Sequence, residues 1–187
     1  DGFGVFGQRF DASGTLVGAE FQVNTYTTNS QGVPDVGIDG NGNFVIVWVS
    51  DGSWGSDNSD YSIQGRIFFS NGLPAGPEDQ VNTRTDSRQN TPAVAVDSDS
   101  GFVVVWGDSS DGSGGGIRGQ RYGSNGLPAG AEFLVNSCTT EWQTRPSVAI
   151  DASGGGRALA DRDLPAARHV VLLLRLAPQE LTRSERG

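Results

Sequence analysis

An internal repeat dominates this sequence. The segment Val5-Phe6-Gly7-Gln8-Arg9-Phe10 returns 58 residues later at residues 63–68 and a further 54 residues on at residues 117–122. Single-residue anchors keep the same two offsets: Gly14, Gly72 and Gly126; Glu20, Glu78 and Glu132; Asn24, Asn82 and Asn136; Pro34, Pro92 and Pro146; Asp39, Asp97 and Asp151. Self-similarity at a fixed period of this length is typical of repeat architectures. The chain is therefore expected to contain two full units and two partial ones.

Each unit is expected to form four short strands. Around the middle of the chain these are residues 63–69, 80–83, 93–96 and 102–106. β-branched and aromatic residues dominate these runs, and Gly, Asn, Asp and Ser cluster between them. The run at 102–106 is continuously apolar, as is its counterpart one repeat earlier, which suits strands that are buried on both faces.

Four strands in a period of this length indicate the blade of a β-propeller. A β-sandwich would share the short strands and the turns, but it would not need the same anchors in three copies. The expected fold class is therefore all-β, with tandem four-stranded antiparallel blades of an incomplete β-propeller. Repeats of the β-sandwich type are the alternative.

The repeat also divides the chain. Residues 1–32 are expected to supply the last two strands of one blade, residues 33–90 and 91–144 two whole blades, and residues 145–156 the start of a truncated blade. A closed propeller needs at least four blades. The chain is therefore expected to be a fragment or to assemble with further blades.

The pattern stops within the fourth unit. The period places the phenylalanine and tryptophan of the last strand where the sequence has Gly156 and Ala160, and residues 157–187 hold six of the 13 Arg and the only His. Two interpretations of this atypical tail are open. It is either a frameshifted continuation of the repeat or a genuine C-terminal helix with its apolar part at His169 to Ala177.

Composition excludes several classes of function. The net charge is −9 and there is no Lys, which argues against a nucleic-acid partner because phosphate binding needs a basic face. Such a charge is compatible with cation binding and with a solvated extracellular surface. Cys138 is the only cysteine, so no internal disulfide forms. Residues 1–4 show no signal peptide, and the longest apolar run, Val170 to Leu174, is too short for insertion into a membrane.

The anchors resemble repeats of large secreted or surface proteins of bacteria, of the form G-Q-R-F…V-N-T…P-x-V-A-x-D…F-V-V-V-W. The resemblance covers residues 5–156. It implies β-propeller blades, distantly similar to those of sialidases, in an extracellular or cell-surface protein that often has no assigned activity. The aspartate box of sialidases, S-x-D-x-G-x-T-W, is not recognisable in this sequence.

Two polar loops are candidates for calcium. Asp39, Asn41 and Asn43 lie at alternate positions between two expected strands, as do Asp97 and Asp99. Alternate spacing allows carboxylate and amide oxygens to converge on a hard cation, although the distal bidentate Glu of an EF-hand is absent. The favoured interpretation is a hairpin turn, in which Asp, Asn and Gly bond their own backbone.

A second candidate is the loop from Asp51 to Tyr61, which varies in length between the units. An exposed Trp54 and Tyr61 among acidic residues would suit stacking on the face of a sugar. The equivalent loop at residues 108–116 has no aromatic residue, so any such site is not repeated. A solvated loop without a ligand is the more ordinary interpretation.

The remaining anchors have structural interpretations. The recurring Asn of Val-Asn-Thr is expected to bond a turn between blades. Trp48 and Trp106 are expected to fill the space between neighbouring sheets.

No catalytic residue is predicted. Glu20, Glu78 and Glu132 recur in every unit, and neither a G-x-S-x-G motif nor a phosphate-binding Gly loop is present. The expected function is a non-enzymatic repeat scaffold or binding module of a secreted or cell-surface protein. Its expected partners are glycans, surface proteins or further blades, with no cofactor apart from possible calcium. The alternative is a fragment of a sialidase-like propeller glycoside hydrolase.

Overall fold

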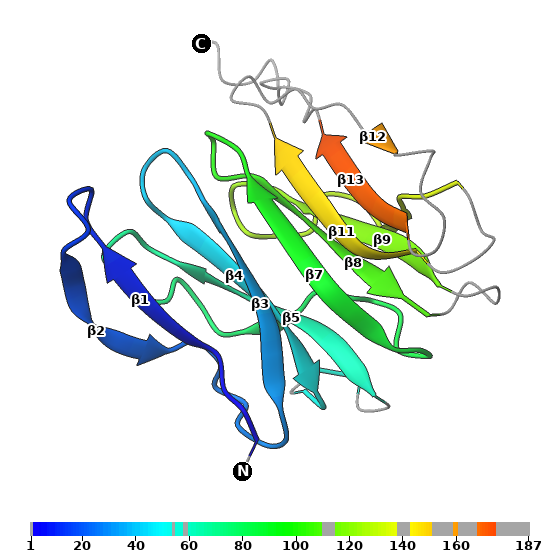
Figure 1. Ribbon diagram of the computed structural model, residues 1–187, viewed down its shortest axis with the longest axis horizontal. Coiled ribbons are helices and arrows are strands. Elements are labelled where there is room, and N and C mark those ends of the chain that lie inside the picture. The colour runs from blue at the N-terminus through cyan, green and yellow to red at the C-terminus, as the bar shows by residue number, and fades with distance from the viewer. Residues whose placement is uncertain are drawn as a thin grey trace, which may run out of the picture.

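The chain folds into successive β-sheets that follow one another along the sequence (Figure 1). The computed structural model describes residues 2–53, 55–57, 60–109, 115–137 and 143–150, and the backbone alone at 159–160 and 168–174. The strands in chain order are β1 (Phe6–Phe10), β2 (Leu16–Gln22), β3 (Gln31–Ile38), β4 (Phe44–Asp51), β5 (Tyr61–Phe68), β6 (Asp79–Gln80), β7 (Gln89–Val96), β8 (Phe102–Asp108), β9 (Gly116–Tyr122), β10 (Phe133–Leu134), β11 (Gln143–Ile150), β12 (Leu159–Ala160) and β13 (Arg168–Leu174).

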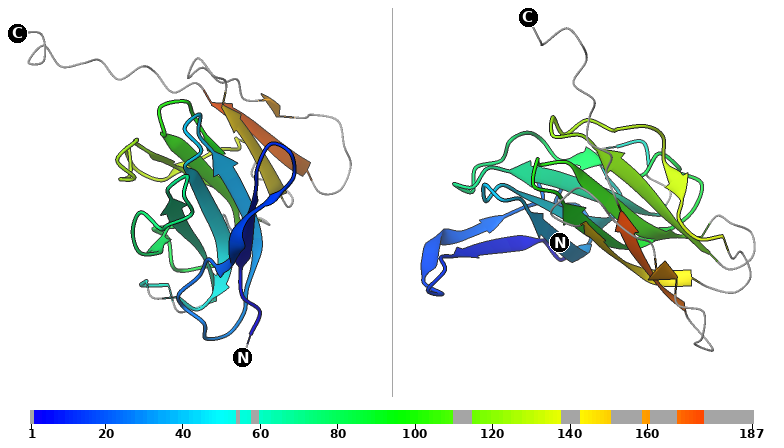
Figure 2. Two further views of the ribbon diagram at one scale, coloured as in Figure 1. Left: turned by 90° about the vertical axis from the view of Figure 1, so that its left-hand side faces the viewer. Right: turned by 90° about the horizontal axis from the view of Figure 1, so that it is seen from above.

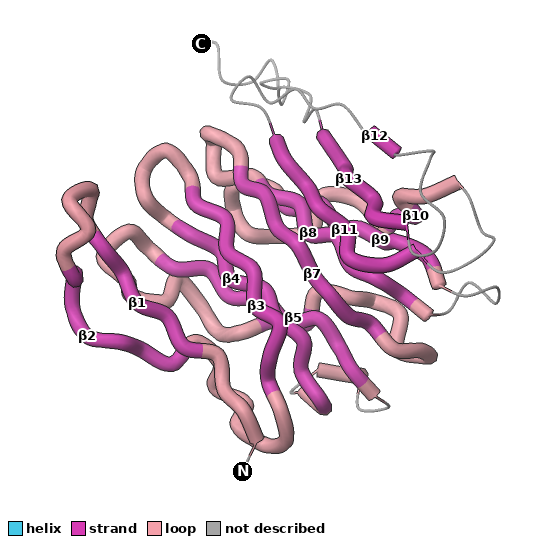
Figure 3. Tube along the Cα trace, in the orientation of Figure 1, coloured by secondary structure: helices cyan, strands magenta, loops and turns pink. Residues whose placement is uncertain are grey.

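Two of the sheets have four antiparallel strands each. Their strands lie side by side in chain order, β3-β4-β5-β6 in one and β7-β8-β9-β10 in the other. Strands and loops make up the whole described part of the chain, without a helix (Figure 3). The expected all-β class with four-stranded antiparallel sheets is thus confirmed.

The second strand of each complete sheet is buried along nearly its whole length. β4 and β8 are the continuously apolar runs of the sequence, and only Asp51 at the end of β4 is partly exposed. A strand needs apolar residues at every position when both faces of its sheet are covered. Each of these two sheets therefore packs against another sheet on either side.

Three apolar clusters lie between the successive sheets. The first joins Val5 and Val23, which flank the β1–β2 hairpin, to Trp48, and the second joins Val47 to Trp106. The third joins Val103 and further residues of β7 to β9 to residues of β11. Trp48 and Trp106 are both fully buried in these clusters, which confirms that they fill the space between neighbouring sheets.

The described sheets form an open stack. The β1–β2 hairpin is a separate two-stranded sheet that projects from one end of the molecule in the view from above (Figure 2). Within the described residues the sheets do not close into a ring. At the other end, β11 pairs in parallel with β13, and β12 pairs antiparallel with β13.

The atypical tail contributes to that last sheet. Where the sequence left open a helix over His169 to Ala177, residues 168–174 form strand β13, and residues 175–187 lie outside the described part of the chain. No helix long and apolar enough to traverse a lipid bilayer occurs in the described residues.

Candidate functional site

The recurring asparagines close the end of each unit. The side-chain Oδ1 atoms of Asn24, Asn82 and Asn136 accept hydrogen bonds from the backbone N–H groups of Val5, Ile63 and Ile117, at 2.8, 2.8 and 2.6 Å. Each of these bonds lies within one unit. Asn24 and Asn82 also donate from Nδ2 to the carbonyl oxygens of Tyr26 and Arg84, at 2.8 and 2.7 Å, which is the turn contact expected of this Asn.

The same asparagines also reach into the following unit. Asn82 Nδ2 donates to Gln89 Oε1 at 3.1 Å, and Asn136 Nδ2 donates to Gln143 Oε1 at 3.0 Å. Gln89 and Gln143 begin β7 and β11, the first strands of their sheets. Each asparagine thus links the end of one unit to the beginning of the next.

The recurring glutamates form a second link between units. Glu78 accepts hydrogen bonds from the backbone N–H groups of Thr25 and Tyr26, which lie in the preceding unit. One repeat later, Glu132 Oε2 accepts from the backbone N–H and the hydroxyl of Thr83, each at 2.9 Å. Both junctions therefore use a carboxylate of one unit to bind the Val-Asn-Thr segment of the unit before it.

One junction carries charges that do not recur. Arg118 pairs with two carboxylates, Asp108 through Nε at 3.0 Å and Glu132 through Nη1 at 3.1 Å. The preceding unit has Ser50 and Gln64 at the positions of Asp108 and Arg118. The repeat pattern does not predict this cluster, because Asp108 and Arg118 replace uncharged residues on two neighbouring strands of one unit alone.

The Asp108 carboxylate is nearly inaccessible, and Arg118 is about four-fifths buried. Asp108 Oδ1 also accepts a hydrogen bond of 2.9 Å from the Ser87 hydroxyl. Buried charges persist when they are paired and hydrogen-bonded. The cluster therefore fixes the position of β9 against β8 and against the segment that leads into β7.

The first calcium candidate is a closed hairpin turn between β3 and β4. Asp39 Oδ1 accepts hydrogen bonds from the backbone N–H groups of Asn41 and Asn43, at 2.8 and 2.9 Å. Asp39 Oδ2 accepts from the Asn43 amide at 2.9 Å and from the Ser100 hydroxyl at 2.6 Å. Burial alone would raise the pKa of Asp39, but these hydrogen bonds outweigh it and lower the pKa below its ordinary value.

The second calcium candidate repeats this turn between β7 and β8. Asp97 Oδ1 accepts from the backbone N–H groups of Asp99 and Gly101, at 2.9 and 2.8 Å. Both loops thus have the hydrogen bonds of the hairpin interpretation. No group of three or more His, Cys, Asp or Glu side chains in the described residues is placed to hold a metal ion. Calcium binding by these loops stays a prediction.

The aromatic loop is described only in part. Trp54 lies outside the described residues. Tyr61 begins β5 and packs against the second apolar cluster, and the Arg88 guanidinium carbon lies 4.1 Å from the centroid of its ring. A sugar that stacked on this face of Tyr61 would have to displace Arg88.

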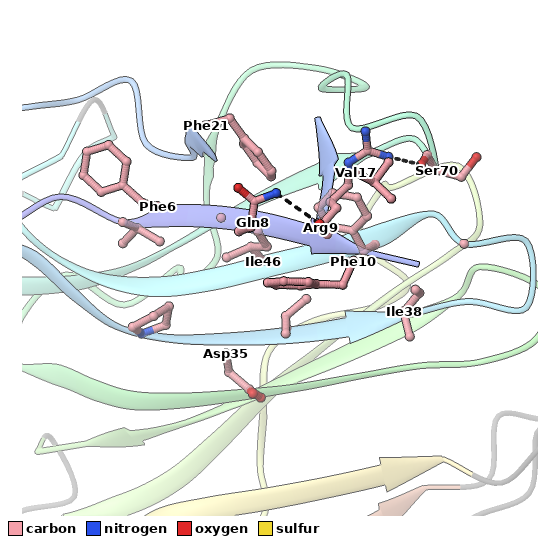
Figure 4. Close-up of a pocket in the computed structure, with 16 residues that line it drawn as sticks. Phe6, Gln8, Arg9, Phe10, Val17, Phe21, Asp35, Ile38, Ile46 and Ser70 are labelled. Carbon is pink, nitrogen blue, oxygen red and sulfur yellow. Dashed lines mark hydrogen bonds between the residues drawn. The ribbon is translucent and has the colours of Figure 1, made fainter. Parts of the chain in front are cut away.

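A groove between the first two sheets was not anticipated from the sequence. It encloses about 700 Å³ between the β1–β2 hairpin and the β3–β4 strands (Figure 4). Its apolar walls include Phe6 and Phe10 of β1, Phe21 of β2, and Val36 and Ile38 of β3.

Three polar side chains in this groove already have partners. Arg9 Nη1 donates to the Ser70 carbonyl oxygen at 2.7 Å, and Gln8 Nε2 donates to the Arg9 carbonyl oxygen at 3.0 Å (Figure 4). Asp35 Oδ2 accepts from the backbone N–H of Val94 at 2.8 Å. What remains for an occupant is mainly apolar surface, together with the edge of β1 that is unpaired within the described residues.

No protein-family model and no curated protein matches this chain.

Proposed function

We propose that this chain is a non-enzymatic repeat scaffold of a secreted or cell-surface protein, built from propeller-type blades. The observation that carries the proposal is the recurrence of both junction contacts. Glu78 and Glu132 bind the preceding unit, and Asn82 and Asn136 bind the following one. Contacts that repeat with the sequence period allow units to be added in series, as in other repeat proteins.

The packing of the sheets supports blades rather than sandwiches. A sandwich shares one core between two inner faces, and its outer faces contact solvent. In the sheet β3–β6, Val45 and Val47 pack toward β7–β10, whereas Phe44 and Ile46 pack toward the β1–β2 hairpin. Apolar contact on both faces is what a blade between two neighbouring blades requires.

The non-repeated charges support a scaffold more than a hydrolase. Glycoside hydrolysis uses a pair of carboxylic groups that flank the scissile bond. Asp108 and Glu132 instead share Arg118, and Glu132 also binds Thr83 of the preceding unit. Glu132 therefore holds two units together, and Asp108 holds β9 against β8 within one sheet.

The loops at the ends of the strands are the proposed binding elements. The loop from Asp51 to Tyr61 differs in length and composition from its counterpart in the next unit, while the sheets beneath them are alike. A rigid framework with a variable loop is a common way to present a binding surface. We assign this loop to the recognition of glycans or of surface proteins.

A glycan array tests the binding role. The chain is compared with a loop variant in which residues 52–60 are replaced by a Gly-Ser linker of equal length. We expect the chain to retain a subset of glycans that the loop variant does not retain. Equal retention by both proteins would contradict the role of the loop. Cleavage of the retained glycans, detected by mass spectrometry, would overturn the non-enzymatic assignment.

A further inference from the structure

The β1–β2 sheet has half the strands of a complete unit. By the repeat, β1 corresponds to β5, which hydrogen-bonds to β4 on one side and to β6 on the other. β1 pairs with β2 alone within the described residues. The other edge of β1 faces the groove (Figure 4). It corresponds to the edge by which β5 pairs with β4. A free strand edge presents a row of backbone groups that can pair with an added strand.

The face of β3 that lines the groove is apolar and exposed. Val36 and Ile38 are 59% and 65% exposed. Their counterparts one repeat later, Val94 and Val96, pack in the second cluster with Val45 and Val47 of the preceding sheet. Exposed β-branched residues at positions that are covered elsewhere in the same repeat indicate a missing partner rather than a solvent face.

The third unit follows the same rule. Val148 and Ile150 of β11 pack in the third cluster against Ala93, Ala95 and Val103 of the sheet before them. The first strand of the covering sheet contributes small residues at these contacts. A Cβ built on Gly37 would lie only 2.7 Å from Val96. A sheet that covers the next one thus presents a small residue on its first strand and valines on its second strand.

Within the described residues, Phe10 has no ring partner of the kind that its counterparts have. Phe68 stacks on Phe44 of the neighbouring second strand, with ring centroids 5.0 Å apart. Tyr122 stacks in the same way on Phe102, at 4.4 Å. Phe10 is 60% exposed and projects into the groove (Figure 4). An aromatic residue at the start of a further second strand, equivalent to Phe44 and Phe102, would stack on Phe10 in the same way.

We propose that the groove between β1 and β3 binds a two-stranded β-hairpin of the same repeat type, made of the first and second strands of a further unit. Its second strand adds to the free edge of β1 and places its leading Phe on Phe10. Its first strand and its valines cover Val36 and Ile38. This proposal deepens the proposed function, because it names the partner of one surface of the scaffold.

The hairpin has to come from a further repeat unit. The β3–β4 and β7–β8 hairpins of this chain are already built into their own sheets. Glu20 also indicates a preceding unit. It occupies the repeat position of Glu78 and Glu132, which each bind the unit before them, and its side chain is exposed. Within the described residues, a second copy of this chain would have to open one of its complete sheets to supply such a hairpin.

Binding of a synthetic hairpin tests the proposal. The probe is a fluorescein-labelled peptide of residues 89–108 with a solubilising tag, and the control peptide carries Phe102→Ser, Val103→Ser and Val105→Ser. Fluorescence anisotropy of the labelled peptide with the full chain is expected to show saturable 1:1 binding by the probe. The control peptide is expected to bind at least about tenfold more weakly, because it lacks the residues that fill the groove.

Variants of the protein locate the site. The double variant Val36→Glu/Ile38→Glu is expected to weaken probe binding at least about tenfold. The matched control Leu73→Glu, an equally exposed apolar position outside the groove, is expected to leave binding unchanged. Circular dichroism verifies that each variant keeps its sheet content.

Several outcomes would overturn the proposal. These are equal binding of both peptides, probe binding that the double variant leaves intact, or an absence of saturable binding. Self-association of the chain without peptide, abolished by the double variant in sedimentation, would instead assign this face to a second copy. Glycan cleavage would contradict the non-enzymatic scaffold function but would not affect the binding of the hairpin. Failure of the proposed function and failure of hairpin binding are therefore distinguishable.

Discussion

Trp106 shows how a single buried residue couples two units. Its side chain is fully buried in the cluster that joins the β3–β6 and β7–β10 sheets. Its indole N–H is also buried and has no hydrogen-bond partner in the described structure, as is true of Trp48. Trp106 therefore stabilises the fold through the volume that its side chain fills and not through a hydrogen bond.

Replacement of Trp106 tests that assignment. Trp106→Ala is expected to lower the free energy of unfolding by about 3–5 kcal/mol, because it leaves a large cavity between two sheets. Trp106→Phe is expected to cost clearly less, because it keeps most of the volume and removes an unpaired buried donor. Urea denaturation measures both values. An Ala variant as stable as the parent chain would contradict the placement of Trp106.

Asp39 provides a test that depends on pH. Its pKa in the folded chain lies below the ordinary 3.8, so the folded state holds this proton less tightly than the unfolded state. The carboxylate therefore stabilises the fold above pH 3.8, and this contribution is lost as pH falls through the folded pKa. Asp39→Asn is expected to lower the melting temperature near neutral pH and to flatten its decline under acid.

Melting curves between about pH 6 and pH 2 measure this effect. Asp86→Asn is a useful control, because the pKa of Asp86 is also lowered, through its hydrogen bond with Arg84, but its side chain is mostly exposed. An Asp39→Asn variant that keeps the full acid dependence of the parent would contradict the role of the turn.

At the scale of the strands, the short last strand of each unit has a clear cause. β6 ends at Gln80, although the apolar and Val-Asn pattern extends the expected strand to residue 83. Val81 still donates its backbone N–H to the Ile63 carbonyl, but the Ile63 N–H is taken by the side chain of Asn82. The side-chain amide of Asn82 thus replaces a backbone hydrogen bond between the third and fourth strands of the unit.

Removal of Asn82 tests this replacement. Asn82→Ala is expected to lower the free energy of unfolding by about 2–3 kcal/mol, because the buried Ile63 N–H and Gln89 amide lose their partner. Asn125→Ala removes a similar side-chain bond from an exposed turn, to Leu127 N–H. It is expected to cost less than about 1 kcal/mol. Equal costs measured by urea denaturation would contradict the account.

The apolar runs of the sequence predict the central residues of the strands but not their polar ends. The expected strand at 93–96 begins at Gln89 in the structure, because Gln89 and Asn90 pair with Asp108 and Gly107 before a bulge at the proline. Polar residues that pair in a ladder carry no apolar signal. The β4 and β8 runs were recognised because burial on both faces makes every position apolar.

The candidate sites were harder to predict for a different reason. The hairpin turns at Asp39 and Asp97 depend on local bonds, and their local sequence indicates them well. The groove beside Phe10 and the Asp108–Arg118 pair depend on which sheets stack and which edge stays free. Such information lies in the arrangement of the units and not in any one segment.

At the scale of the whole molecule, the sheets form a series with one open apolar end. The junctions between them repeat the same carboxylate contacts, and the exposed Val36, Ile38 and Phe10 mark the end where the proposed hairpin would bind. The proposed ring of blades would cover this end. Each unit is thus bound to the next by the same carboxylate contact.

Hydrogen exchange by NMR tests that claim most directly, since the carboxylates of Glu78 and Glu132 bind amides that belong to the preceding unit. Glu78→Ala is predicted to speed exchange at the Thr25 and Tyr26 amides and to leave Thr83 protected. Glu132→Ala is predicted to do the reverse. Exchange at these amides that neither substitution changes, or that both change alike, would contradict the repeated junction.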